Sequence, residues 1–329
     1  MLPQDRLEKI ISHAISERVE FVLIAGDIYD KEDQSIKAQV QFYKEMKRLE
    51  EARIDVFLIH GNHDFLEQER DRLELPKNVH TFSSDVSCVP WQSPTGTKIH
   101  FYGFSYDKRH IRENRLGDYR KHGDADFHIA LLHGSEETKA SEHDVYAPFG
   151  LKEMKQKGFD YWALGHIHKR EILSSQPGIY YPGNIQGRSK KETGAKGGTI
   201  VELSEMGATF SFFETAPVMW EKKQIVLEGK ADRTEIYRAT DELFQTYRDT
   251  LCSYVIDLEI VTEQASKFDA DEWLQLFEEM RTESPFVWIN TLRFIEKNQA
   301  VSDKWYQGQF LADELDASLA ELMEDETFF

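Results

Sequence analysis

Four hydrophobic segments of this sequence share one design, and that design limits the folds open to the chain. Each is a run of β-favouring apolar residues that ends abruptly in Asp, Asn or His beside a glycine. An apolar run that stops in this way is typical of a buried strand, and open α/β sheets bind ligands at the carboxyl ends of their strands. The four endings are Gly26-Asp27, Gly61-Asn62-His63-Asp64, His133-Gly134 and Gly165-His166-Ile167-His168.

The segments between these endings predict an α/β fold. Strand 21–25, helix 34–52 and strand 54–59 form a βαβ unit, which has a right-handed crossover. Short β segments follow from 79 to 104, and the α/β alternation returns between 127 and 164. Two further strands, within 198–213, have the spacing of an antiparallel pair. We therefore expect a two-sheet sandwich flanked by helices.

A second, smaller domain is expected after Pro217. The pattern there is strand, helix, strand, helix, strand, which predicts a compact β-α-β-α-β cap domain over 216–296. Residues 1–215 would form the first and larger domain. The remainder, 297–329, is predicted to be a helical tail with a leucine stripe on one side of 308–324.

Composition excludes several classes of protein. No apolar run approaches the roughly 18 residues of a membrane span, so we expect no membrane association. Cys88 and Cys252 are the only cysteines, which makes a disulfide framework improbable and favours a reducing, cytoplasmic location.

Charge and histidine are unevenly distributed along the chain. The net charge is −19, and residues 216–329 carry −14 of it. A phosphate backbone would be repelled by the chain as a whole, so nucleic-acid binding would depend on local basic patches. All 12 histidines lie at or before His168, so imidazole chemistry belongs to the first domain.

The polar residues at the four strand ends are those that bind divalent metal ions. Carboxylate and amide oxygens together with imidazole nitrogens form a hard-to-borderline donor set. Two divalent ions can clamp the attacking and leaving oxygens of a phosphoryl displacement, and a carboxylate is needed between them. Asp27 is placed for that bridge. We predict that Asn62, His133 and His166 ligate one ion, and that His168 ligates the other.

His63 is predicted to be catalytic rather than a ligand of the same ion as Asn62. Adjacent side chains diverge, and imidazole titrates near working pH, so His63 suits a general acid for the leaving oxygen. Asp64 could orient it. Taken singly, each motif has an ordinary explanation: Gly-Asp is a common turn, and a lone histidine at a strand end is usually structural. Four such endings together favour a metal site.

In that order, the four endings resemble the calcineurin-like metallophosphoesterase superfamily. The segment Tyr181-Pro182-Gly183-Asn184, continued through Arg188, and the later run Glu192-Thr193-Gly194-Ala195-Lys196 are similar to SbcD-type DNA repair exonucleases, especially their YhaO-like branch. The resemblance spans roughly residues 5–215. It implies the same ligand set and catalytic histidine, two divalent ions with Mn²⁺ as the metal, DNA as substrate and an SbcC-like ATPase as partner.

The sequence departs from the family pattern at one point. The resemblance implies a strand that ends in Asp-x-His ahead of Asp27, and no such motif precedes Asp27 here. We therefore expect a chain that lacks its first strand, a second metal site that is weak, and apolar sheet surface that favours a homodimer.

The function expected from these features is a metal-dependent DNA exonuclease or phosphodiesterase acting in DNA repair. Two alternatives stay open: another metallophosphoesterase, such as a phosphatase, and a catalytically deficient binding subunit. Four basic residues near the Gly-rich segment are candidate phosphate contacts: Arg188, Lys190, Lys191 and Lys196.

Overall fold

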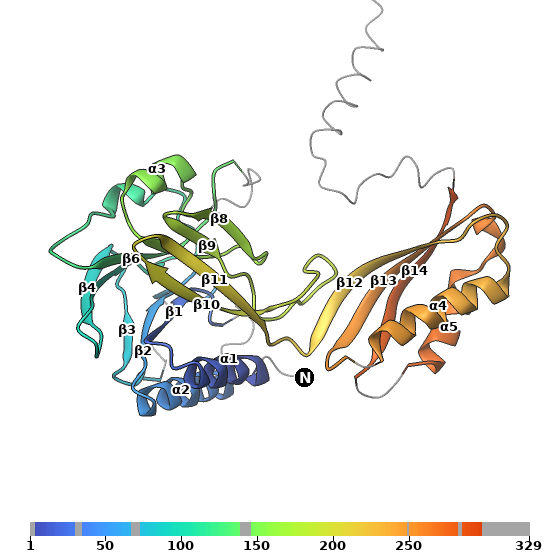
Figure 1. Ribbon diagram of the computed structural model, residues 1–329, viewed down its shortest axis with the longest axis horizontal. Coiled ribbons are helices and arrows are strands. Elements are labelled where there is room, and N and C mark those ends of the chain that lie inside the picture. Colours follow the sequence, from blue (N-terminus) through green and yellow to red (C-terminus); the bar gives the residue numbers. More distant parts are fainter. Residues whose placement is uncertain are drawn as a thin grey trace, which may run out of the picture. The chain divides into compact units, whose positions relative to one another are not determined.

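The computed structural model divides the chain into two compact units, Met1–Met219 and Trp220–Phe329. It describes residues 4–29, 35–66, 73–138, 146–248, 250–281 and 285–297. Figure 1 shows the elements of each unit along the chain. The division lies four residues beyond the end of the first domain predicted from the sequence.

The first sheet of the N-terminal unit, sheet A, is parallel and has the order β1-β2-β3. Its strands are β1 (Phe21–Ala25), β2 (Asp55–Ile59) and β3 (Val79–Thr81). Helix α2 (Ile36–Glu51) connects β1 to β2, and α1 (Gln4–Ser16) precedes β1. This is the βαβ unit that the sequence predicted.

The second sheet, sheet B, has six strands in the order β4-β5-β6-β7-β9-β8. Its central strands β5, β6, β7 and β9 run parallel, and β4 and β8 are antiparallel at the two edges. Pro90 lies in β4, where an edge tolerates a residue without an N–H group. The strands are β4 (Ser87–Gln92), β5 (Lys98–Gly103), β6 (Phe127–His133), β7 (Tyr161–Gly165), β8 (Glu171–Ser175) and β9 (Gly178–Tyr181).

Smaller elements complete this unit. An antiparallel hairpin pairs β10 (Gly197–Ser204) with β11 (Gly207–Glu214). A 3₁₀ turn, η2 (Leu116–Asp118), lies between β5 and β6, and helix α3 (Leu151–Gln156) precedes β7.

Three apolar clusters show how the layers pack. One lies between sheets A and B and includes Phe57 and Ile59 of β2 against Phe101 of β5 and Leu131 of β6, all fully buried. A second packs α1 and α2 against the outer face of sheet A. The third covers the other face of sheet B, centred on Trp162. The two-sheet α/β architecture predicted from the sequence is therefore confirmed.

The C-terminal unit contains a three-stranded sheet with the order β12-β13-β14 and two main helices. Asp232 caps α4 with a capping box that includes Glu235, which explains why that helix begins there. The elements are β12 (Val218–Val226), α4 (Arg233–Tyr247), β13 (Ser253–Thr262), the 3₁₀ turn η3 (Ala265–Lys267), α5 (Ala270–Glu279) and β14 (Val287–Glu296). The helix predicted over 308–324 lies outside the described residues.

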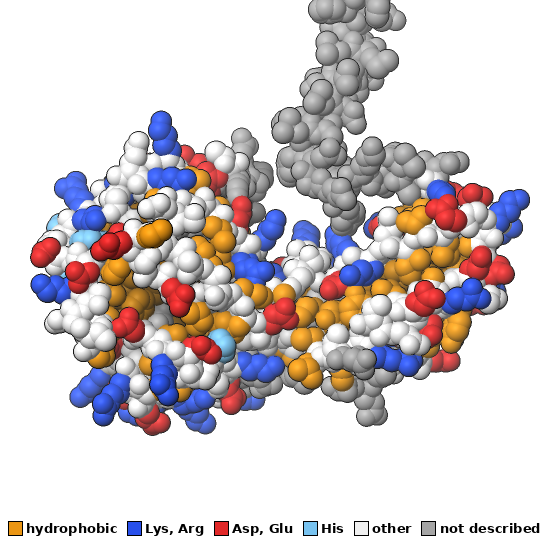
Figure 2. Space-filling view, in the orientation of Figure 1, with side chains coloured by type: hydrophobic (Ala, Val, Ile, Leu, Met, Phe, Trp, Pro, Cys, Tyr) orange, Lys and Arg blue, Asp and Glu red, His pale blue; other side chains and the backbone are white. Residues whose placement is uncertain are grey.

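Surface charge is mixed on the face of the N-terminal unit seen in Figure 2, where Lys and Arg side chains lie among Asp and Glu side chains. This face has no single broad basic area. Among the described residues, none of the helices has the length and apolarity needed to cross a bilayer.

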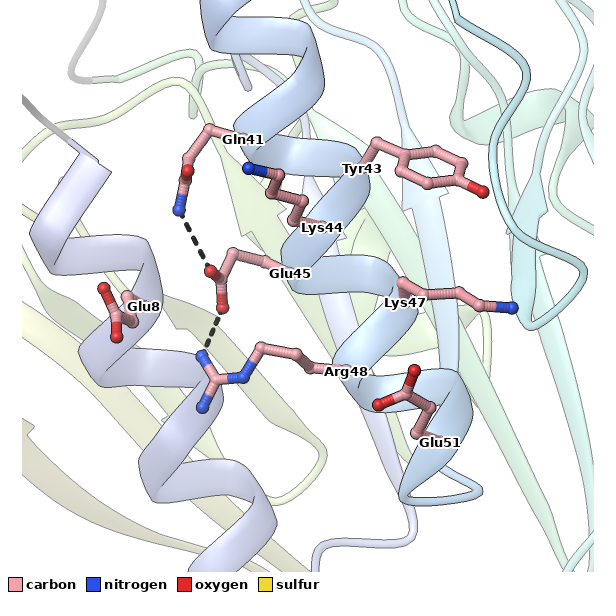
Figure 3. Close-up of a pocket in the computed structure, with 8 residues that line it drawn as sticks. All are labelled: Glu8, Gln41, Tyr43, Lys44, Glu45, Lys47, Arg48 and Glu51. Carbon is pink, nitrogen blue, oxygen red and sulfur yellow. Dashed lines mark hydrogen bonds and ion pairs between the residues drawn. The ribbon is translucent and has the colours of Figure 1, made fainter.

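A buried carboxylate ties α2 to α1 on the outer side of sheet A (Figure 3). Glu45 is 3% exposed, accepts a hydrogen bond from Gln41 Nε2 at 3.0 Å and pairs with Arg48 at 2.5 Å. Arg48 also donates to Ser12 Oγ of α1 at 2.8 Å. These bonds link Gln41, Glu45 and Arg48 of α2 to Ser12 of α1, so we assign this polar cluster a structural role.

Candidate metal centre

The carboxyl ends of β1, β2, β6 and β7 bring the predicted polar residues together. The strands run parallel within each sheet, so their C-terminal ends lie on one side. Three ligand atoms from Asp27, His133 and His166 lie within 4.8 Å of one another, and Asn62 bonds to two of these residues. We call these four residues the strand-end cluster.

Asp27 is held in an unusual backbone conformation. Its φ is 56°, in the left-handed region that Asp and Asn tolerate better than most residues, and it follows Gly26 at φ 89°. The backbone N–H groups of Asp27, Ile28 and Gly61 donate to the carboxylate of Asp64 at 3.2, 3.0 and 2.7 Å. Asp64 therefore joins the loop after β1 to the loop after β2.

Glycines allow the strand-end loops to approach so closely. A Cβ atom on Gly61 would lie 2.3 Å from Asp27 Oδ1 and 2.7 Å from His133 Cε1. A Cβ on Gly165 would lie 1.7 Å from the carbonyl oxygen of Ala25. Any side chain at these two positions would occupy the space in which the cluster forms, which is why glycine stands beside the polar residues.

Asn62 lies between the two histidines of the cluster. His133 Nε2 is 2.9 Å from Asn62 Oδ1 and 3.4 Å from Asp27 Oδ2, and His166 Nδ1 is 3.3 Å from the same Asn62 oxygen. His133 Nδ1 lies 2.8 Å from the carbonyl oxygen of Ala25. Since a carbonyl only accepts, Nδ1 carries a proton, which leaves Nε2 as the nitrogen directed at the cluster.

Electrostatics in the cluster favour an ionised Asp27 carboxylate and a neutral His166 ring. Burial alone would raise the pKa of Asp27, but the charge and hydrogen bond of His133 outweigh it and hold that pKa well below its usual range. Burial lowers the pKa of His133, yet the Asp27 carboxylate more than offsets this and raises it. Burial, reinforced by His133, lowers the pKa of His166 to about 3, so its ring is neutral at neutral pH.

His63 and Asp64 have different surroundings. The backbone N–H of His63 donates to Asp27 Oδ1 at 3.1 Å. This hydrogen bond fixes the backbone of His63, the predicted general acid. Asp64 is fully buried. Its carboxylate binds the backbone of both loops and lies 3.4 Å from His60 Nδ1. Joining those loops, together with its partner His60, is a role that the sequence did not reveal.

His168 lies outside the group whose ligand atoms fall within 4.8 Å. Its side chain is 54% exposed, and Nδ1 lies 2.5 Å from Glu192 Oε1. Burial tends to raise the pKa of Glu192, but the Arg188 backbone bond and His168 outweigh that effect and lower it.

The four basic residues predicted to contact phosphate differ in exposure. Arg188, Lys190 and Lys191 are exposed. Lys196 is 7% exposed, and its Nζ donates to the carbonyl oxygen of His168 at 3.1 Å. The ammonium group of Lys196 is therefore bonded to the segment that carries a predicted ligand.

Three tyrosines contact the residues at these strand ends. Tyr106 OH donates to the carbonyl oxygen of His133 at 2.9 Å, and Tyr181 OH donates to that of Gly134 at 2.6 Å. The ring of Tyr146 lies 4.7 Å from that of His166. Tyr181 belongs to the Tyr-Pro-Gly-Asn segment singled out in the sequence. Its neighbours in the sequence did not indicate that its partner is Gly134, 47 residues earlier.

The donors of the strand-end cluster fit a divalent cation. Two imidazole nitrogens, a carboxylate oxygen and an amide oxygen converge on one point, a donor set suited to Mn²⁺, Fe²⁺ or Zn²⁺. Asn62 Oδ1 and Asp27 Oδ2 can only accept hydrogen bonds, and a cation placed among them would satisfy both.

A two-sheet α/β sandwich with Asp, Asn and His donors gathered at its strand ends has the architecture of a metal-dependent hydrolase. The family model for calcineurin-like phosphoesterases matches residues 3–170, and the chain belongs to this family. Membership implies hydrolysis of phosphate esters with divalent metal ions, and it confirms the resemblance drawn from the sequence.

Several relatives extend the match beyond the family model. The chain is 38% identical over 301 residues to the uncharacterized metallophosphoesterase YhaO of Bacillus subtilis (strain 168), which covers 88% of this chain and 73% of that protein. It is 27% identical over 226 residues to the DNA double-strand break repair protein Mre11 of Sulfurisphaera tokodaii, covering 61% and 53%. For Mre11 of Saccharolobus solfataricus the identity is 28% over 178 residues, covering 53% and 45%. The chain thus spans about half the length of these two Mre11 proteins.

Proposed function

We propose that this protein is a divalent-metal-dependent phosphodiesterase that removes nucleotides from DNA ends, an exonuclease of the SbcD type. The observation that carries the proposal is the convergence of Asp27, Asn62, His133 and His166 at four strand ends. Their donor types match Mn²⁺, which we propose as the metal. When bound there, such ions supply a hydroxide nucleophile and neutralise charge on the phosphate.

The residues of the cluster prepare the site for a cation. Asp27 stays ionised because its pKa is held low, so it offers a full negative charge. His166 stays neutral because burial depresses its pKa, so its lone pair is available for coordination without loss of a proton. Asn62 contributes an uncharged oxygen between the two rings. Asp27 would help to hold both ions, Asn62, His133 and His166 would complete the donors of one, and His168 would be a donor to the other.

His63 is proposed to donate a proton to the leaving oxygen of the phosphodiester. His63 directly follows Asn62, and its backbone N–H bonds to the Asp27 carboxylate. The backbone that carries this imidazole is therefore next to the cluster. An imidazole in that place can transfer a proton near neutral pH, which typically contributes about 10²–10⁴-fold to a rate. Asp64 holds the loop that positions it.

DNA as the substrate is supported by the names of the Mre11 relatives, which are DNA double-strand break repair proteins. Arg188, Lys190 and Lys191 lie exposed in the loop that also contains the Glu192 partner of His168, so they are proposed to contact DNA phosphates. An SbcC-like ATPase partner remains part of the proposal, on the sequence resemblance alone. A homodimer also remains part of it, on the apolar sheet surface expected where the first strand is missing.

The experiment that tests this function compares substrates with the purified full chain and Mn²⁺. End-labelled duplex and single-stranded DNA should release nucleotides, and bis-nitrophenyl phosphate should be cleaved more slowly. His63→Ala should abolish release, whereas His122→Ala, which changes an exposed histidine outside the cluster, should not. Equal activity of His63→Ala and parent would show that the signal comes from a contaminant.

A second candidate is a phosphoesterase that acts on small molecules or proteins. The mixed charge of the face in Figure 2 and the net charge of −19 favour it, because an acidic protein gains little from a polyanionic substrate. Faster cleavage of a nitrophenyl phosphate monoester than of any DNA would select this candidate and reject the exonuclease.

A further inference from the structure

His168 is held by a residue that lies outside the strand-end cluster, Glu192. His168 follows β7 by three residues, and its half-exposed ring bonds through Nδ1 to Glu192, a residue 24 positions later. Among the described residues no hydrogen bond reaches Nε2 of His168. Among the described residues, the protein therefore bonds one nitrogen of this half-exposed ring, and Nε2 is available to a ligand.

Glu192 is itself well fixed. Its side chain is 15% exposed, and its second oxygen, Oε2, accepts a hydrogen bond from the backbone N–H of Arg188 at 2.6 Å. The backbone N–H of Glu192 donates to the carbonyl oxygen of Ser189 at 2.9 Å. One oxygen of the carboxylate thus bonds to its own loop and the other bonds to the imidazole. The loop that holds Glu192 therefore sets the orientation of the His168 ring.

The main chain of His168 is clamped as well. Its carbonyl oxygen accepts from Lys196 Nζ at 3.1 Å and from the backbone N–H of Asn184 at 3.2 Å. A Cβ atom on Gly183 would lie 2.8 Å from the same oxygen, so only glycine permits this approach. Two segments beyond the strand-end motifs, 181–184 and 188–196, therefore close around one histidine.

We propose that Glu192 is a positioning residue that presents Nε2 of His168 to a second divalent cation, with Lys196 fixing the backbone beneath it. The proposal rests on the proposed function, since it assumes that divalent ions bind beside Asp27. A carboxylate on the far nitrogen of a metal-binding histidine sets the tautomer and raises the basicity of the coordinating nitrogen. Lys196, predicted from the sequence to contact phosphate, is here assigned to the protein interior.

The first test is a double-mutant cycle on Mn²⁺ binding, measured by EPR of free Mn²⁺ during titration of the full chain. The parent should show a tighter and a weaker class of site. Glu192→Gln should reduce the affinity of the weaker class about 10- to 100-fold and leave the tighter class unchanged. Glutamine can still accept the Arg188 hydrogen bond, so the loop is preserved. Glu205→Gln, in the exposed turn between β10 and β11, is the control.

The second arm of the cycle separates positioning from a general effect on structure. In a His168→Ala background, Glu192→Gln should cause no further loss of Mn²⁺ affinity, because it acts only through the imidazole. Additive losses, or an unchanged weaker class in Glu192→Gln, would overturn the proposal. A parent that binds only the tighter class would overturn it too while leaving the proposed function intact, whereas absence of both classes would remove both.

A spectroscopic readout tests the same contact without metal. Long-range ¹H–¹⁵N spectra of the metal-free chain, assigned with His168→Ala, should show the His168 proton on Nδ1 in the parent. Glu192→Gln should lose this preference while the other histidine signals stay in place. An identical His168 tautomer ratio in both proteins would contradict the positioning role.

Discussion

His166 and His168 lie two residues apart after the same strand and have opposite surroundings. His166 is enclosed, shares Asn62 with His133, and has a pKa lowered to about 3 by burial. His168 is half-exposed and depends on Glu192 from a later loop. The first is placed by the sheet, because its partners are the ends of neighbouring strands. The second is placed by a loop, so its geometry can change without disturbing the core.

The largest effect is expected where the sheet places the cluster. Gly165→Ala would put a Cβ atom 1.7 Å from the carbonyl oxygen of Ala25, so the chain must shift. Overpacking of this kind costs about 3 kcal/mol or more. The melting temperature should then fall by on the order of 10 °C. Gly117→Ala, with open space around it, should melt like the parent, and equal melting of both variants would contradict the packing described here.

Asp27→Asn should remove activity and leave the fold intact. Asparagine has the same shape and tolerates the φ of 56°, but it lacks the charge that offsets a cation. The lost transition-state stabilisation is several kcal/mol, which corresponds to a fall in kcat/KM of about 1,000-fold. Steady-state kinetics and a thermal melt check both halves of this expectation. Asp85→Asn, an exposed aspartate, serves as control, and activity near the parent level in Asp27→Asn would rule out the bridging role.

The two histidines themselves should differ in their effect on metal binding. His166→Ala should weaken the tighter Mn²⁺ site by about 100-fold or more, since the ring is part of the enclosed donor set. His168→Ala should spare that site and weaken only the second, by about 10- to 100-fold or more, because the loss of the imidazole includes the whole effect of Glu192→Gln. Isothermal titration of both variants decides the matter. Equal losses at the tighter site would mean that sheet and loop histidines serve one ion.

The smallest effect is expected on the exposed loop. Replacing Arg188, Lys190 and Lys191 by Gln should weaken DNA binding and flatten its salt dependence, by a slope of roughly 0.7–0.9 for each phosphate that is no longer neutralised. Hydrolysis of bis-nitrophenyl phosphate should not change, because these side chains lie outside the cluster. Binding measured at several salt concentrations provides the check. A salt slope equal to that of the parent would place the DNA elsewhere.

The sequence predicted the strand-end cluster because each polar ending is adjacent in sequence to the strand that positions it. Each residue of the cluster lies at the end of an apolar strand or within three residues of it, and parallel strands deliver their ends to one side. The α/β architecture followed from the same pattern. Strand β8 (Glu171–Ser175) was not predicted, since it is short, largely polar and irregular, with a register shift between Ile172 and Ser174.

The supporting residues could not be predicted, because their roles depend on partners far along the chain. Asp64 accepts from backbone groups 36 and 37 residues earlier, which its own neighbourhood does not show. Lys196 looks like a surface cation in the sequence, yet it is buried against a carbonyl 28 residues away. Such contacts arise only when distant loops meet.

The left-handed backbone at Asp27 limits how a protein with this fold can lose its chemistry. Few side chains accept that conformation, and asparagine and glycine are the replacements that cost the backbone least. A variant that lost phosphate cleavage but kept this backbone would carry either of these two residues at the position with the least strain. The residue at this one position therefore distinguishes related proteins that keep the carboxylate of the metal centre from those that have lost it.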